Sequence, residues 1–239
     1  TVKVVKKYLN SAIQIGTNID LGTYSNAGKS VSFNEDATIM AIGIPNYRTS
    51  SGSVKIYQYS SNAWTQLGSD INGEQNYDYS GSSVSLSSDG KTVAISAPYN
   101  DSNVADTGHV RIYNYDGSNW TQLGFDIDGE AAQDYSGHSV SLSADGNTLA
   151  IGAVGNDGNG IESGHVRIYN YNGTSWSKLG SDIDGEAAND QSGYSVSLSS
   201  DGTTLAIGAN KNDSNGNDSG HVRVYNYNAS PTSAGTWSQ

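Results

Sequence analysis

The sequence predicts an all-β fold built from repeated units of four short antiparallel strands. One segment, GHSVSLSADGNTLAIG at Gly137, recurs with small changes at Gly81 and Gly193 and with larger changes at Gly28. The copies are spaced by 53, 56 and 56 residues, and a period of this length with four strands is what the blade of a β-propeller requires. The abundance of Gly, Ser, Asn and Asp also favours short strands joined by tight turns over helices.

Within one unit, the apolar pattern separates inner from outer strands. The third copy has four strand-like stretches, at residues 139–143, 148–153, 165–171 and 176–183. In the first two, Val, Leu and Ile alternate with Ser, Ala and Gly, so small residues cover one face and allow close stacking near an axis. These two stretches are therefore predicted to be innermost. Asp145-Gly146 between them favours a tight hairpin, because glycine accepts positive φ, whereas the first copy has the less suitable Asp36-Ala37.

The repeats divide the chain into a single domain with a leading half unit. The expected divisions are a half-blade at 1–27 and blades at 28–80, 81–136, 137–192 and 193–239. Residues 2–4 align with 54–56 at an offset of 52, so the chain is expected to open with the outer strands of a blade. We therefore expect four blades and a half-blade that belong to a larger propeller or to one completed by another chain.

Charge and composition restrict the partners. Twelve basic and 24 acidic side chains give a net charge of −12, which argues against nucleic acid and anionic membranes. The short apolar runs predict no membrane insertion, and the absence of cysteine excludes disulfides and thiolate metal sites. Proteins, sugars and cations remain as ligands.

Three motifs occur together in order in the third unit: SGHSVSLS at 136–143, LAIGA at 149–153 and SGHVRIY at 163–169. In this combination the chain resembles the FG-GAP repeat of large secreted microbial proteins and, more distantly, the head propeller of integrin α chains. The resemblance implies a propeller of about seven blades on an extracellular protein that binds partners or cell surfaces. The Asp-rich calcium loop that integrin copies carry between the first two strands has no counterpart in the short turn at 143–147.

The loops between the second and third strands are the candidate metal sites. They repeat Asp, Asn and acidic residues at alternating positions around glycine, a pattern of hard oxygen ligands that fits calcium. The candidate ligands are Asp101, Asn103, Asp106, Asp157, Asn159, Glu162, Asp213, Asn215 and Asp218. The alternative is that these residues form a long turn in which the side chains bond their own backbone.

Other repeated residues are predicted to be structural. An acidic cluster recurs after the outer strand, at Asp126, Asp128, Glu130 and Asp134 and again at Asp182, Asp184, Glu186 and Asp190. Equivalent positions also hold His109, His165 and His221, beside Arg111, Arg167 and Arg223. A catalytic histidine is normally unique in its site, so repetition favours a structural role. The outer strands begin with Trp64, Trp120 and Trp176, which either pack between blades or stack on sugars.

The sequence thus indicates a non-enzymatic binding or adhesion module, located outside the cell or on its surface, that contacts a protein or a glycan. Uniform repetition favours this function, because no blade is visibly specialised for chemistry. The sequence also allows two other functions. One is a structural subunit, a homo-oligomer that assembles into an extracellular filament or sheath through exposed strand edges. The other is a carbohydrate-active enzyme on a propeller scaffold, which would need converging carboxylates.

Overall fold

A computed structural model confirms the all-β prediction. It describes residues 1–8, 11–23, 25–101, 104–229 and 235–239. Within these ranges the only helical element is one turn, α1 (Tyr47–Ser50). The described part of the chain contains no helix long and apolar enough to span a bilayer.

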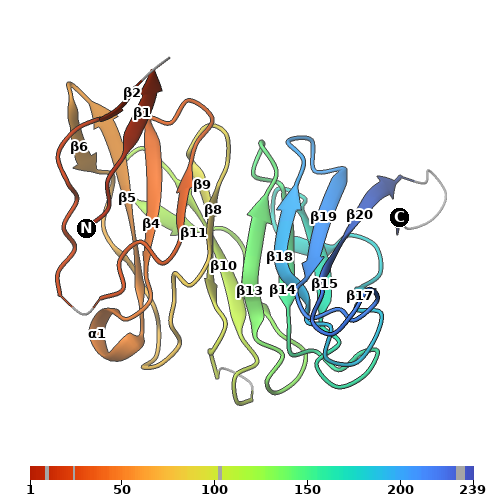
Figure 1. Cartoon of the computed structure of the whole chain (residues 1–239). Helices are drawn as coiled ribbons and strands as arrows, with labels where there is room; N and C mark the ends of the chain where they lie inside the picture. Colours follow the sequence, from red (N-terminus) through yellow and green to blue (C-terminus); the bar gives the residue numbers. More distant parts are fainter. Residues whose placement is uncertain (9–10, 24, 102–103, 230–234) are drawn as a thin grey trace.

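Four antiparallel sheets follow one another along the chain (Figure 1). The first contains β3 (Val31–Phe33), β4 (Ile39–Ile44), β5 (Ser53–Ser60), β6 (Ala63–Gln66) and β7 (Ile71–Asn72). The second contains β8 (Val84–Leu86), β9 (Thr92–Ala97), β10 (His109–Tyr115), β11 (Trp120–Gln122) and β12 (Ile127–Asp128). The third contains β13 (Ser136–Leu142), β14 (Thr148–Ala153), β15 (His165–Tyr171), β16 (Trp176–Lys178) and β17 (Ile183–Asp184). The fourth contains β18 (Ser192–Leu198), β19 (Thr204–Ala209), β20 (His221–Asn228) and β21 (Thr236–Ser238).

A two-stranded hairpin, β1 (Val5–Tyr8) and β2 (Ser11–Gln14), precedes the first sheet. Val4 beside it packs against Met40 and Ile42 of β4. The bridge between Val2 and Ile19 corresponds to the pairing of β5 with β7 in the first sheet. The hairpin therefore has the position of the outer half of a blade, as the alignment of residues 2–4 predicts.

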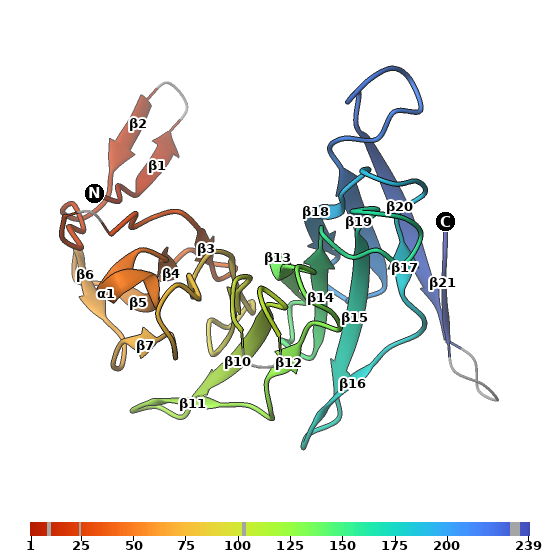
Figure 2. The ribbon, with the colours of Figure 1, turned by 90° about the horizontal axis from the view of Figure 1, so that it is seen from below.

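The sheets follow an arc, with the inner strands β3, β13 and β18 toward its concave side and the outer strands β11 and β16 pointing away from it (Figure 2). The inner hairpin turns are connected by backbone hydrogen bonds from sheet to sheet. Glu35 N–H donates to Ser88 O at 3.1 Å, Ser88 N–H to Ala144 O at 2.8 Å, and Ala144 N–H to Ser200 O at 2.9 Å. These hydrogen bonds hold each inner hairpin turn in line with the turn of the next sheet.

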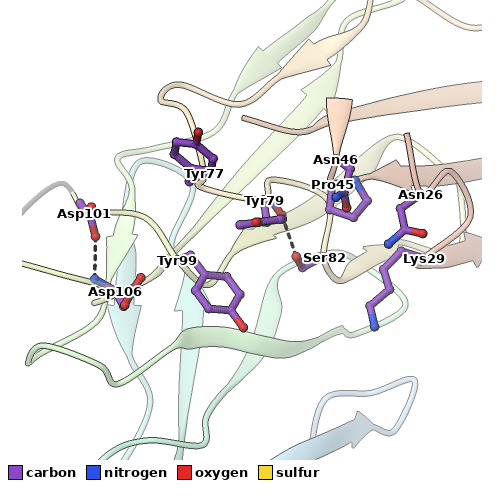
Figure 3. Close-up of a pocket in the computed structure, with 10 residues that line it drawn as sticks. All are labelled: Asn26, Lys29, Pro45, Asn46, Tyr77, Tyr79, Ser82, Tyr99, Asp101 and Asp106. Atoms are coloured by element: carbon purple, nitrogen blue, oxygen red, sulfur yellow. Dashed lines mark hydrogen bonds between the residues drawn. The ribbon is translucent and has the colours of Figure 1, made fainter. Parts of the chain in front are cut away.

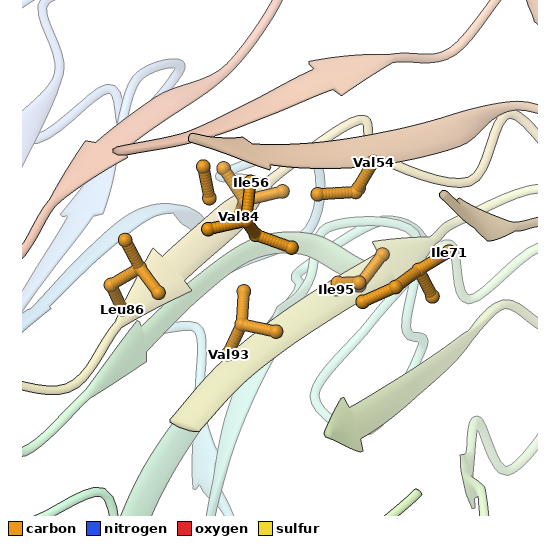
Figure 4. Close-up of a cluster of buried hydrophobic side chains, with 8 residues drawn as sticks. Val54, Ile56, Ile71, Val84, Leu86, Val93 and Ile95 are labelled. Atoms are coloured by element: carbon orange, nitrogen blue, oxygen red, sulfur yellow. The ribbon is translucent and has the colours of Figure 1, made fainter. Parts of the chain in front are cut away.

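The core lies between the sheets. Between the first two sheets, apolar residues of β5 and β7 pack against those of β8 and β9 (Figure 4): Val54, Ile56, Ile71, Val84, Leu86, Val93 and Ile95. Equivalent clusters fill the next two junctions. Small residues permit the close approach that the alternation predicts, because a Cβ on Gly152 would lie 2.1 Å from the carbonyl oxygen of Gly193.

The inner hairpin turns match the prediction from Asp-Gly. Gly146 has φ of +71°, and Ser143 O accepts its N–H at 3.0 Å. In the first copy Ala37 adopts φ of +57° at this turn, a conformation that is strained for a residue with a Cβ. Alanine is thus the less suitable residue there, as expected.

The outermost stretch differs from the prediction. Instead of one strand over 176–183, the chain forms β16 and then β17, which pairs with the beginning of β15. Gly180, at φ of +82°, lies between the two short strands and allows the chain to turn there. Each of the first three sheets therefore gains a short fifth strand, β7, β12 or β17.

The last sheet has an uncovered apolar face. Val166 and Ile168 of β15 are 0% and 1% exposed, because the fourth sheet covers them, whereas the equivalent Val222 and Val224 of β20 are 67% and 48% exposed. At the other end of the arc, Val31 of β3 is 51% exposed. Equivalent faces are thus buried inside the stack and open at its ends.

Candidate functional site

The predicted metal-binding loops follow β9, β14 and β19. In each, the first aspartate accepts the backbone N–H five residues further on: Asp106 N–H bonds Asp101 Oδ1 at 2.6 Å, Glu162 N–H bonds Asp157 Oδ1 at 2.8 Å, and Asp218 N–H bonds Asp213 Oδ1 at 2.7 Å. These loops are therefore closed by their own side chains, as the turn interpretation predicts.

Other candidate ligands in these loops are partly engaged. The Asn159 amide nitrogen donates to Gly185 O at 2.9 Å and to Glu186 O at 3.0 Å. Glu162 Oε2 accepts a hydrogen bond from Gln191 at 2.9 Å. Asn215 lies in the equivalent loop after β19, and Asn103 lies outside the described residues. Calcium at these positions remains a prediction.

The last aspartate of the acidic cluster is buried and holds two loops together through hydrogen bonds. Asp134, 2% exposed, accepts through Oδ2 from the N–H groups of Glu130 and Ala131 at 3.2 and 3.0 Å and from the Asn156 amide at 3.2 Å. These donors precede the aspartate or come from the loop after β14, so the carboxylate connects two loops of one blade. Two equivalent aspartates bond the same way: Asp78 with Asn100, and Asp190 with Asn212.

The repeated histidines and arginines lie at the junctions between blades. Arg111 Nη1 is 3.2 Å from Glu74 Oε1 of the preceding blade, and its Nη2 donates to Asn72 O at 3.0 Å. Arg167 repeats this arrangement with Glu130, at 3.2 Å, and with the carbonyl of Asp128. The arginines therefore connect consecutive blades, as a structural role predicts.

Two groups of potential metal ligands appear at these junctions. Glu74, His109 and Asp126 form the first, and Glu130, His165 and Asp182 form the second. In each group one ligand atom per residue lies within 4.8 Å of the others, so each group could hold a metal ion. Neither group includes any of the loop residues predicted from sequence.

The tryptophans form hydrogen bonds between consecutive blades. Each indole Nε1–H donates to a carbonyl of the preceding blade: Trp64 to Ile15 at 3.2 Å, Trp120 to Leu67 at 2.9 Å, Trp176 to Leu123 at 2.9 Å and Trp237 to Leu179 at 3.0 Å. A tyrosine of the neighbouring strand packs on each ring, as Tyr115 does on Trp120 at 5.1 Å between centroids. These contacts support packing over sugar stacking for the tryptophans.

A groove lies where loops of the first two blades meet (Figure 3). It has a volume of about 600 Å³ and is lined by Asn26, Lys29, Pro45, Asn46, Tyr77, Tyr79, Ser82, Tyr99, Asp101 and Asp106. Asp101 and Asp106 lie at one end and Lys29 at the other, with tyrosines between them. A volume of this size is typical of small-ligand sites.

Tyrosines dominate the middle of this groove. Tyr77 and Tyr99 are 61% and 44% exposed. The ring of Tyr99 lies edge-on between Tyr79 and Tyr135, with centroid distances of 5.2 and 5.3 Å. This row of rings joins three loops and exposes aromatic surface next to amide and carboxylate groups.

Sequence reasoning missed this groove. Tyr99 breaks the repeat, since the equivalent residues are Gly155 and Lys211. A departure from the repeat at a loop position was the available signal. Burial and the nearby charge of Asp101 raise the pKa of Asp106 above its usual value.

A family comparison matches two segments of the chain. The family described as FG-GAP repeat matches residues 127–169 and 182–225. Together with the stacked four-stranded sheets, this shows that the chain carries FG-GAP repeats on a β-propeller scaffold. A search of curated proteins finds no match to the chain.

Solved structures share the fold at low sequence identity. A candidate 6-phosphogluconolactonase from Bacteroides uniformis superposes with a TM-score of 0.60 at 14% identity, over 96% of this chain and 58% of its own. Hydrazine synthase from Kuenenia stuttgartiensis is similar over 82% of this chain and 49% of its own, at 15% identity and a TM-score of 0.49. The chain thus spans little more than half the length of the first of these structures.

Proposed function

We propose that the chain is a non-enzymatic, extracellular recognition module that binds a glycan in the tyrosine groove. The observation that carries this proposal is the set of tyrosine rings, with Tyr77 and Tyr99 exposed and Tyr79 partly buried, beside amide and carboxylate groups in a groove of about 600 Å³. Sugar rings present apolar C–H faces that stack on aromatic side chains. Their hydroxyl groups pair with amides and carboxylates, which Asn26, Asn46 and the two aspartates supply.

The remaining chemistry supports binding more than catalysis. The repeated histidines lie at blade junctions, with His109 and His165 only 1% and 2% exposed. Of the two carboxylates in the groove, Asp101 holds its own loop through the backbone of Asp106. A hydrolytic site would instead need a free acid and base directed at one bond.

The test is saccharide binding with a matched pair of aromatic substitutions. We expect Tyr99→Ala to weaken binding of a glycan selected on an array by about two- to tenfold, because one stacked ring contributes roughly 0.5–1.5 kcal/mol. Isothermal titration calorimetry measures the loss. Phe125→Ala removes an 89% exposed ring outside the groove and should leave the affinity unchanged.

Two results would contradict the glycan proposal. One is that the unmodified chain binds no glycan on the array. The other is that Phe125→Ala and Tyr99→Ala weaken binding equally. If a specific protein partner is recovered and its binding requires Tyr99, the groove binds protein and not glycan.

Calcium in the loops after β14 and β19 is a second part of the proposal. Asp157 Oδ2 and Glu162 Oε1 make no hydrogen bond within the described chain, and such carboxylate oxygens suit calcium. We expect calcium to raise the melting temperature by about 2–4 °C over EDTA, the shift for roughly 1 kcal/mol in a chain of this size. Asp157→Asn should reduce the effect. Identical melting curves in calcium and EDTA would exclude the site.

Assembly with other copies is the competing proposal, and the open end faces favour it. Val222 and Val224 expose an apolar surface that the next blade covers at the equivalent Val166 and Ile168. An exposed apolar surface of this kind favours packing against another sheet. Sedimentation velocity of the purified chain separates this alternative from a monomeric binding module.

A further inference from the structure

The two His-carboxylate groups at the blade junctions have a geometry that the recognition function does not use. At the junction of the first and second sheets, His109 Nδ1 lies 3.7 Å from Asp126 Oδ2. Glu74 extends from the preceding blade to the same place. The next junction groups His165, Asp182 and Glu130 in the same way, except that Lys178 Nζ lies 2.7 Å from Asp182 Oδ1, where the first junction has the neutral Gln122 beside Asp126.

The histidines in these groups are buried and incompletely paired. His109 is 1% exposed, and its Nδ1 has no hydrogen-bond partner in the described chain. His165 is 2% exposed, and its Nε2 also lacks one among the described residues. Burial, followed by the nearby Arg111 or Arg167, lowers the pKa of each imidazole.

We propose that each of these two junctions binds a divalent transition-metal ion, with zinc as the reference metal, through one imidazole nitrogen and two carboxylates. Imidazole together with carboxylate suits zinc and its neighbours, whereas calcium prefers ligand sets made only of oxygen. Because the glutamate comes from one blade and the other two ligands from the next, the ion would clamp consecutive blades together.

The arginines at the junctions are compatible with this site. At the first junction, two carboxylates and the Arg111 guanidinium leave a net charge of −1 before the ion binds. Arg111 also keeps a second partner, Asn72 O at 3.0 Å, when Glu74 turns toward a metal. The Glu74 side chain is 43% exposed and can make that adjustment.

The chain contains its own control at the next junction. His221 Nε2 lies 3.4 Å from Glu186 Oε2, but among the described residues no second carboxylate joins them in a ligand group. Within this part of the chain, the third junction therefore has only two of the three ligands. It should bind zinc much more weakly than the other two.

The experiment is titration of the EDTA-treated chain with zinc, followed by calorimetry, and with cobalt, followed by its visible absorption. We expect two ions per chain, matching the two ligand groups. His165→Ala should lower this number by one, and His221→Ala should leave it unchanged. Zinc should also raise the melting temperature of the unmodified chain, since it binds only the folded state.

A second substitution guards against misfolding of the histidine variant. The Glu130 side chain is 48% exposed, so Glu130→Gln should fold normally and weaken one site by about tenfold or more. Glu186→Gln is its matched control, with no expected effect on either site. The proposal is overturned if fewer than two ions bind, or if the substitutions at the third junction reduce binding as much as those at the second.

Discussion

Asp134→Ala is expected to lower the free energy of unfolding by about 3 kcal/mol or more. The Asp134 carboxylate is 2% exposed and accepts from two backbone N–H groups and from the Asn156 amide. Alanine would leave the buried Asn156 amide and two partly buried backbone N–H groups without their acceptor. An unsatisfied buried group costs about 1–3 kcal/mol, and a hydrogen bond to a charged group contributes about 1.5–3 kcal/mol. The loop after β14 would then lose its connection to the loop before β13.

Denaturant unfolding of Asp134→Ala, Asn156→Ala and the double variant measures this effect. Because both residues contribute to one hydrogen bond, at 3.2 Å, the two losses should not add. The exposed Asp116, which bonds only its own turn, provides the control, and Asp116→Ala should cost less than about 1 kcal/mol. A loss of under about 1 kcal/mol for Asp134→Ala would show that the buried connection is unimportant.

The second large effect concerns the stacking of blades. Val166→Ala should lower the free energy of unfolding by about 2 kcal/mol, because it removes buried methyl groups and leaves a cavity. Val222→Ala changes the same residue at the equivalent position of the next blade and should cost less than about 0.5 kcal/mol. The difference follows from exposures of 0% and 67%.

The same unfolding experiment compares these two variants. Equal losses would mean that the face of β20 is covered in solution, contrary to the 67% exposure of Val222 in this structure. If a second copy of the chain covers this face, the loss of unfolding free energy for Val222→Ala should depend on protein concentration. Independence from concentration combined with equal losses would contradict the stacking account itself.

The repeated parts of the fold were predictable from the sequence because the blades impose the same constraints. Alternation of Val and Leu with Ser and Gly marked the inner strands, and Asp145-Gly146 marked their turn. The division of the outer stretch into β16 and β17 was not predicted. Pairing of Ile183 with Val166 depends on how the chain turns after β16, which apolar periodicity does not encode.

The candidate sites were harder to predict, because they join residues that are distant in sequence. Metal ligands were sought within single loops, yet Glu130 and His165 are brought together by two different blades. The tyrosine groove likewise combines four loops, and Tyr99 is visible in the sequence only as a departure from the repeat. The repeated residues predict the features that all blades have in common. The groove depends on residues such as Tyr99 that are found in one blade and not in the others.

A co-crystal structure of the chain with its array-selected oligosaccharide tests the recognition proposal most directly. The account predicts a sugar ring stacked on Tyr99, with its hydroxyl groups bonded to side chains of the groove shown in Figure 3. A saccharide bound instead at the outer strands, with the groove free, would contradict it.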